Sequence, residues 1–200
     1  MPYYHDLITE KSWRILQNLR RAYDFILIGG WAVYLYTKKL KSKDIDIICE
    51  FDTLESLRQT YELRKNPSLK KYEITIEEVD VDIYVSFFSE LGVPIDAIQK
   101  QTVSIEGFIL PKKEVLLLLK QKAFHDRKLT LKGEKDTIDV ISLLTTDFDM
   151  KKYKKLVQQL HLQTYQKELT ELLKSTKEVP TLNMNAHQFS RLKQKLFSEL

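Results

Sequence analysis

Residues 25–47 read FILIGGWAVYLYTKKLKSKDIDI, and this stretch decides the fold. The apolar run Phe25–Ile28 predicts a buried strand, Gly29-Gly30 predicts a turn, and Trp31–Thr37 predicts the start of a helix. The segment Asp44–Phe51 begins with strict apolar-polar alternation, which predicts a second strand. A Gly-Gly turn is therefore followed, at a short distance, by a strand that opens with two carboxylates.

The remaining chain divides into a mixed first part and a helical second part. Before residue 111, the patterns predict helices at 7–22 and Thr53–Leu63, a loop at 66–70, strands at Tyr72–Ile76 and Val79–Val85, and a hairpin formed by Val103–Ile105 and Phe108–Leu110. After Pro111, they predict helices at Glu114–Arg127, Asp136–Leu144, Lys151–Leu160, Tyr165–Leu173 and Ala186–Leu200. We therefore predict an α/β (α+β) fold with domains 1–110 and 111–200.

The composition sets limits on compartment and partners. The 200 residues are 43% hydrophobic and carry a formal net charge of +4, which permits a sizeable core and suits a nucleotide or RNA ligand. Cys49 is the only cysteine, so no internal disulfide forms, and a reducing cytosol is expected. The polar start MPYYHDLITE and the short apolar run Val115–Leu119 predict neither a signal peptide nor a membrane span. We expect a cytoplasmic protein.

Two carboxylates in the second strand point to metal chemistry. Residues i and i+2 of a strand project from one face, so Asp44 and Asp46 project together, while Ile45 and Ile47 face the core. Neighbouring carboxylates repel unless a cation lies between them, and Mg²⁺ prefers oxygen ligands. The alternative is a pair of solvated acids on a half-exposed strand, although Asp is disfavoured in strands.

A third carboxylate is offered by the strand Val79–Val85, where Asp80 and Asp82 again share one face. If this strand pairs beside Asp44–Ile47, one of the two completes a three-carboxylate cage, which would hold two metal ions. We favour Asp82 because it lies inside the strongest alternating stretch, and Asp80 is the alternative.

Gly29-Gly30 supplies features that suit a phosphate group. Glycine lets a ligand approach the backbone closely, and the following helix presents free N–H groups and the positive end of its dipole. By itself a Gly-Gly pair before a helix is usually only a turn. Its combination with D-I-D is more specific.

These motifs carry a resemblance to a known family. The elements I28-G29-G30, a gap of thirteen residues, D44-I45-D46-I47 and V81-D82-I83 resemble the DNA polymerase beta-like nucleotidyltransferase superfamily over residues 24–86. The segment LLLLKQKAFHDRKLTLKGEKDTIDVISLL is similar to the helical part of small bacterial and archaeal nucleotidyltransferases, including the abortive-infection toxin-like group. There a K-x-x-A segment is followed by R and K-D-x-x-D, which correspond here to Lys120, Arg127, Lys135-Asp136 and Asp139. Lys122 is the alternative to Lys120.

The resemblance implies an enzyme. It implies Mg²⁺-dependent transfer of a nucleoside monophosphate from an NTP, such as ATP, to a hydroxyl acceptor with release of pyrophosphate. In this scheme the metal ligands are Asp44, Asp46 and Asp82, and the nucleotide-binding residues are Gly29, Gly30, Ser42, Lys120 and Arg127. Two Mg²⁺ ions are expected, with Mn²⁺ as a substitute. Asp136 and Asp139 would orient Lys120 or Arg127, or serve as ordinary acids at a helix start.

The acceptor and the partners stay open at this stage. RNA such as tRNA, a protein and a small molecule are all compatible with the motifs. One rival is a non-catalytic nucleotide- or RNA-binding protein of the same fold, and another is the toxin of a toxin–antitoxin pair, with an antitoxin as partner. An apolar stripe on the last helix predicts either packing on the body or a homodimer contact, through Phe189, Leu192, Leu196 and Leu200.

Overall fold

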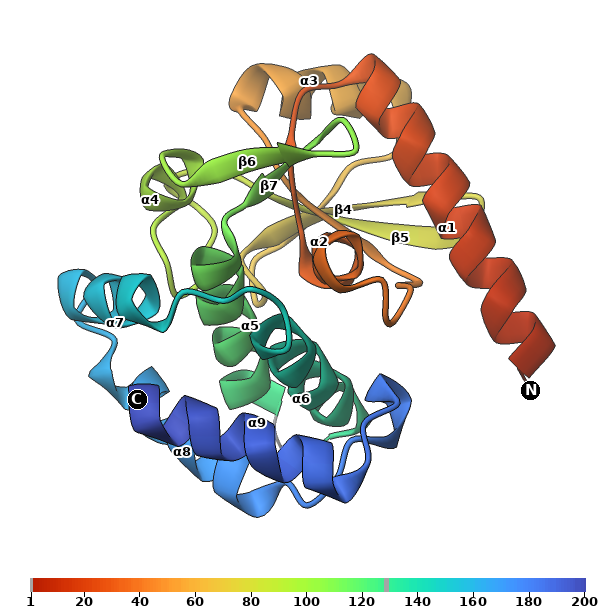
Figure 1. The fold of residues 1–200 in the computed structure, drawn as a ribbon. Coiled ribbons are helices and arrows are strands. Elements are labelled where there is room, and N and C mark those ends of the chain that lie inside the picture. The colour runs from red at the N-terminus through yellow and green to blue at the C-terminus, as the bar shows by residue number, and fades with distance from the viewer. Residues whose placement is uncertain (1, 128–129) are drawn as a thin grey trace. The chain divides into compact units, whose positions relative to one another are not determined.

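The computed structural model describes residues 2–127 and 130–200 (Figure 1). The chain divides into two compact units, Met1–Lys112 and Lys113–Leu200. The first contains all the described strands, and the second is helical.

The first unit is built on one mixed sheet of seven strands. Its elements are α1 (Pro2–Ala22), β1 (Ile26–Ile28), α2 (Gly29–Thr37), β2 (Ile45–Ile48), α3 (Phe51–Thr60), β3 (Arg64–Asn66), β4 (Lys71–Ile76), β5 (Val79–Tyr84), α4 (Ile95–Gln99), β6 (Thr102–Ile105) and β7 (Phe108–Pro111). The strand order is β3-β4-β5-β2-β1-β7-β6. The β2/β5 and β1/β7 pairs are parallel, and the other neighbours are antiparallel. The expected α/β class with a mixed sheet is confirmed.

Several boundaries differ from the sequence-based expectation. The first helix begins at Pro2 instead of residue 7, and the helix expected at Asp136–Leu144 begins at Leu131. Helix α2 begins at Gly29, so the Gly-Gly pair forms the first turn of the helix instead of preceding it. The second strand ends at Ile48, and Phe51 begins α3 because Leu54 and Leu57 are buried at helical spacing. Strand β3 and helix α4 were not predicted. Both are short: β3 has three residues and no buried side chain, and α4 has five residues, with Ile95 and Ile98 as its buried pair.

Alternation in the central strands separates a core face from a polar face. Ile45, Ile47, Val81 and Ile83 are fully buried, and Leu27 pairs with Ile47 on the same face. The residues between them are the polar ones, among them Asp46 and Asp82. Paired residues in neighbouring strands project to the same side, so the polar residues of β2 and β5 share the opposite face.

An aromatic cluster holds helix α2 in place. Trp31, only 1% exposed, donates a hydrogen bond from Nε1 to Ser12 Oγ of α1 at 2.9 Å. Its ring packs against Trp13 and Tyr34 at centroid distances of 4.9 and 5.4 Å. Trp31 is therefore a core residue, and the start of α2 at Gly29 is set by burial two residues later.

The second unit is a helical bundle. It contains α5 (Lys113–Arg127), α6 (Leu131–Leu144), α7 (Met150–Gln159), α8 (Gln163–Ser175), the 3-10 turn η1 (Pro180–Leu182) and α9 (Ala186–Glu199). Helix α5 is buried from Glu114 to Gln121, which includes polar residues. Phe189 and Leu196 of the apolar stripe on α9 are buried, and α9 contacts α7.

A membrane-crossing segment was not expected. In residues 2–127 and 130–200, no helix has both the length and the apolar character that crossing a bilayer requires.

Candidate functional site

A row of polar side chains crosses four strands of the first unit. Asp46 of β2 is paired with Asp82 of β5, Asp82 with Glu73 of β4, and Glu73 with Arg64 of β3. On the other side, Asp46 is paired with Ile28, the last residue of β1. Because paired residues project to one side of a sheet, the register places two carboxylates side by side next to the end of β1.

Gly29 lies directly against the first of these carboxylates. Its φ is +67°, a backbone conformation that favours glycine. A Cβ built on Gly29 would lie 1.9 Å from Asp46 Oδ2 and 2.6 Å from its Cγ. The start of α2 and the Asp46 carboxylate are therefore in contact, and a side chain at position 29 would displace one of them.

The N-terminus of α2 suits an anion. Its N-cap residue, Ile28, makes no side-chain hydrogen bond to the first turn. The first N–H groups of a helix lack intrahelical acceptors and carry the positive end of the helix dipole. Gly30 and Trp31 are buried in this turn, while Gly29 is partly exposed. Backbone N–H donors and the Asp46 carboxylate thus meet at one place.

Lys71 neutralises the second carboxylate from the next strand. Its Nζ lies 2.6 Å from Asp82 Oδ2 and 3.0 Å from Glu73 Oε1. The side chain of Lys71 is 12% exposed, and that of Asp82 is 19% exposed. Asn66 Nδ2 donates a further hydrogen bond to Glu73 Oε1 at 3.0 Å. The polar face therefore contains its own positive charge.

Burial and like charge dominate the electrostatics of Asp82. Burial, followed by the charge of Asp46, raises the pKa of Asp82 from 3.8 to about 6, although the hydrogen bond from Lys71 lowers it. Burial lowers the pKa of Lys71, but its hydrogen bonds to Asp82 and Glu73 outweigh this and raise that pKa above 10.5. Burial and the charge of Asp46 thus outweigh the effect of Lys71 on the pKa of Asp82.

This pKa shift predicts a pH-dependent stability difference in metal-free buffer. Between pH 3.8 and about 6, folded Asp82 keeps a proton that the unfolded chain has lost, so the free energy of unfolding falls as pH rises. Over pH 4 to 7 the loss from this group is up to about 3 kcal/mol. Asp82→Asn lacks this titration, so its stability relative to the wild type should rise over that range. Urea unfolding of both proteins at each pH measures it, and a constant difference would contradict the prediction.

The other expected residues of the first unit have different environments. Asp44 is exposed and precedes β2, two residues from Asp46. Ser42 is 3% exposed. Asp80 is exposed on β5 and accepts a hydrogen bond from Thr75 Oγ1 at 3.1 Å, opposite Thr75 rather than opposite an acid of β2. The register thus places Asp82, and not Asp80, beside Asp46.

Metal binding was predicted at Asp44, Asp46 and Asp82. Among the residues that the structure describes, no group of three or more His, Cys, Asp or Glu side chains is placed to hold a metal ion as it stands. The chemistry of the Asp46/Asp82 pair nevertheless fits a hard divalent cation, because both side chains offer carboxylate oxygens and the β2/β5 register places them side by side. The three-ligand metal site stays a prediction.

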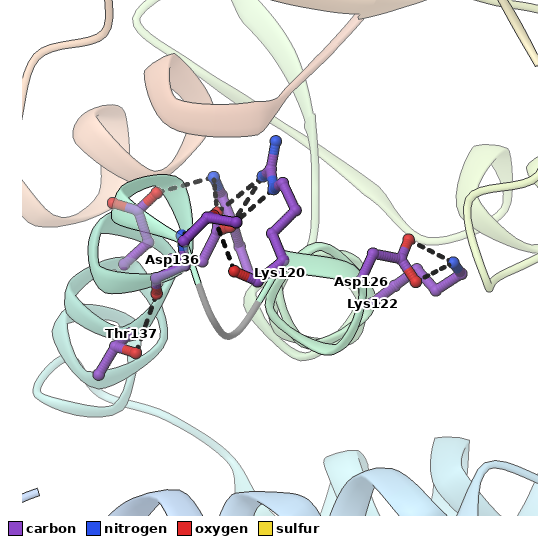
Figure 2. Close-up of polar contacts among 9 residues, drawn as sticks. Lys120, Lys122, Asp126, Asp136 and Thr137 are labelled. Carbon is purple, nitrogen blue, oxygen red and sulfur yellow. Dashed lines mark hydrogen bonds and ion pairs between the residues drawn. The ribbon is translucent and has the colours of Figure 1, made fainter. Parts of the chain in front are cut away.

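Lys120 and Arg127 belong to the second unit, where they form a buried ionic cluster with α6. Lys120 Nζ lies 2.7 Å from Asp139 Oδ2 and 3.7 Å from Asp136 Oδ1, and both acids are almost fully buried. Arg127 binds Asp136 through Nε and Nη2, at 3.1 and 2.8 Å from Oδ2. Figure 2 shows Lys120 and Asp136 together, with Lys122 and Asp126 on another side of α5. The cluster contains two positive and two negative side chains.

Lys120→Met is expected to destabilise the chain by about 3–5 kcal/mol, because it leaves two buried carboxylates with Arg127 as their remaining cation. Lys122→Met is the matched control on the same helix. Lys122 pairs with the exposed Asp126 at 2.7 Å, and an exposed pair of this kind contributes less than about 0.5 kcal/mol. Chemical denaturation of both variants measures the difference. Equal effects would contradict an internal structural role for Lys120.

Comparisons with known proteins place the fold. No protein-family model matches the chain, and no curated protein matches it either. Among solved structures, ANT(2")-Ia in complex with adenylyl-2"-tobramycin matches at a TM-score of 0.54 and 15% identity, over 78% of this chain and 98% of that chain. JHP933 from Helicobacter pylori matches at a TM-score of 0.52 and 18% identity, over 97% and 92%. A Helicobacter pylori protein provisionally assigned as a nucleotidyltransferase matches at 0.51 and 18%, over 97% and 95%.

These likenesses show that the chain shares the fold of these solved structures. The Megavirus polyadenylate synthase matches at a TM-score of 0.47 and 16% identity, and the chain spans 32% of its length.

Two residues of the site were missed from the sequence. Lys71 and Glu73 alternate with Tyr72 and Ile74, so their common face was readable from the strand period. Their position beside Asp82 depends on the pairing of β4 with β5, which the period does not specify.

Proposed function

We propose that this protein is a metal-dependent nucleotidyltransferase that transfers a nucleoside monophosphate from an NTP to a hydroxyl acceptor and releases pyrophosphate. The observation that carries the proposal is the in-register pairing of Asp46 with Asp82 at the uncapped start of α2, where Gly29 touches the Asp46 carboxylate. The nucleotidyltransferase fold supports this reading. A non-catalytic binding protein would not need two adjacent, partly buried carboxylates beside an anion-binding turn.

The phosphate side of the site is assigned to the start of α2. Gly29 and Gly30 would offer backbone N–H groups to the β and γ phosphates, and Ser42 would add a hydroxyl contact. The carboxylate side would be Asp44, Asp46 and Asp82. The triphosphate would thus lie between backbone donors on one side and carboxylates on the other.

The carboxylates would hold Mg²⁺, or Mn²⁺ in its place. When bound, such an ion supplies Lewis-acid neutralisation of phosphate oxygens and makes a hydroxyl more acidic. Asp46 would hold the ion on the side of the site where the triphosphate lies, and the exposed Asp44 would assist it. Asp82, with a pKa of about 6 in the metal-free chain, would accept the proton of the attacking hydroxyl. Its pKa lies close to neutral pH, which suits a general base.

Of the two nucleotide contacts expected on α5, we keep Arg127 as a direct contact and give Lys120 a supporting role. Arg127, with 41% of its side chain exposed, has surface available for an anion, whereas Lys120 is 9% exposed and contacts two acids. We therefore assign to Arg127 the direct phosphate contact and to Lys120 the support of Asp136 and Asp139. Asp136 in turn holds the Arg127 guanidinium.

The acceptor is the least defined part of the proposal. The ANT(2")-Ia structure contains an adenylylated small molecule, tobramycin, so a small polyhydroxyl compound is one acceptor class to test. RNA and protein hydroxyls are the others, and the net charge of +4 suits an anionic acceptor.

The test is a transfer assay with the full chain. Each of the four NTPs, labelled at the α-phosphate, is incubated with Mg²⁺ and with RNA, protein or aminoglycoside acceptors, and pyrophosphate release is measured in parallel. Asp46→Asn serves as the inactive control. The proposal predicts label on one acceptor class and none with Asp46→Asn. Failure to bind any NTP in the presence of Mg²⁺ or Mn²⁺ would overturn it.

A further inference from the structure

One cation is built into the carboxylate row. Lys71 contacts both Asp82 and Glu73, at 2.6 and 3.0 Å, from a side chain that is 12% exposed. The exposed ion pairs of the first unit differ from it. In the Lys11–Glu78 pair, for example, the glutamate side chain is 83% exposed. A buried charge needs compensation that an exposed one obtains from water, so Lys71 and the acids depend on one another.

Strand pairing dictates this position. Glu73 of β4 is directly opposite Asp82 of β5, and Asp82 is directly opposite Asp46 of β2. Lys71 is two residues before Glu73, so it projects from the same face as the three acids and reaches Asp82 diagonally. Its neighbour Lys70 is exposed, and its Nζ lies 6.0 Å from the centre of the Phe88 ring. Lys71 therefore contacts the carboxylates of the row, whereas the exposed side chain of Lys70 lies near Phe88.

We propose that Lys71 is a built-in cation of the carboxylate site and takes the place beside Asp82 that a second divalent ion would otherwise occupy. In the absence of nucleotide, the Asp46/Asp82 pair then binds one divalent ion, on the Asp46 side. The inference rests on the proposed function only in taking these two carboxylates as metal ligands. Lys71 is thus a positioning residue, which acts through Asp82.

Two consequences follow for the site. The ammonium of Lys71 holds the Asp82 carboxylate toward β4, and its charge repels a cation approaching that oxygen. Loss of this charge removes from Asp82 and Glu73 the ammonium that contacts both of them. Divalent ions should then bind more tightly or in greater number. In a chain that lacks the Asp82 carboxylate, neutralising Lys71 should have little effect on metal binding.

The test measures Mn²⁺ binding to the full chain without nucleotide, by electron paramagnetic resonance and calorimetry. Lys71→Met is expected to bind Mn²⁺ at least about tenfold more tightly than the wild type, or to bind a second ion, a tenfold change being about 1.4 kcal/mol. Lys71→Arg retains the charge and should behave as the wild type. Lys70→Met is the matched neutralisation of the adjacent lysine and should also leave binding unchanged. The double variant Lys71→Met/Asp82→Asn should lose the gain.

Other outcomes overturn the inference. Equal affinity and ion number in the wild type and Lys71→Met would do so, as would a Lys71→Arg variant that matches Lys71→Met, or no Mn²⁺ binding in any variant. Circular dichroism checks folding, and Lys71→Gln replaces Lys71→Met if that variant does not fold. The assay uses no substrate. Absence of transfer together with a Lys71-dependent Mn²⁺ site would overturn the proposed reaction alone, and transfer with a Lys71-independent site would overturn this inference alone.

Discussion

Asp82→Ala is expected to lower the rate of nucleotidyl transfer by roughly a thousandfold or more, equivalent to about 4 kcal/mol of activation free energy. Asp80→Ala should lower it by less than about tenfold. The two acids are on the same strand and project from the same face. Asp82 is paired with Asp46 of β2, whereas Asp80 is exposed and accepts a hydrogen bond from Thr75. The first substitution removes a proposed metal ligand that is also the proposed proton acceptor. The second removes a peripheral charge.

The pair is compared by single-turnover kinetics at saturating NTP and Mg²⁺, with folding checked by circular dichroism. Asp82→Asn is included because it preserves side-chain shape and should be as inactive as the alanine variant. A large loss with Asp80→Ala and a small one with Asp82→Ala would show that Asp80, and not Asp82, serves the reaction, and would refute the assignment made from the β2/β5 register.

Gly29→Ala is expected to lower the transfer rate by roughly a hundredfold or more, because a misplacement of about 1 Å in a catalytic group can cost that much. The new Cβ would lie 1.9 Å from Asp46 Oδ2, closer than any non-bonded contact permits. Either the carboxylate or the first turn of α2 must move. The left-handed backbone of Gly29, at φ +67°, also costs an alanine about 1–2 kcal/mol of stability.

Gly92→Ala separates the two effects. Gly92 has a similar φ of +75° but lies between β5 and α4, so alanine there carries a similar backbone cost away from Asp46. Thermal unfolding and transfer rates are measured for both variants. We expect comparable losses of stability, with loss of transfer confined to Gly29→Ala. A Gly29→Ala variant with wild-type transfer would show that Gly29 is only a turn residue.

Several features of this protein were determined by local sequence. The alternation Val79–Val85 specifies which side chains of β5 are buried, because a strand has a period of two, and Val81 and Ile83 are fully buried as that pattern predicts. Gly29-Gly30 predicted that the chain changes direction after the first strand, and β1 ends at Ile28 with Gly29 at a positive φ of +67°. The hairpin at Glu106-Gly107 and the helical second half were also readable, since turn residues and helical spacing act over a few positions.

Only the tertiary structure decided which polar residues meet. A period of two places Asp46, Asp82, Lys71 and Glu73 on strand faces, but it specifies neither the neighbouring strand nor the register, and a slip of one residue would reverse every face. The pairing of Asp46 with Asp82 depends on a parallel β2/β5 ladder between segments more than thirty residues apart in the chain. The family resemblance implied that Asp139 orients Lys120 or Arg127, and the packing of α6 against α5 brings Asp139 Oδ2 to 2.7 Å from Lys120 Nζ. Non-local packing sets these contacts, so no local pattern could predict them.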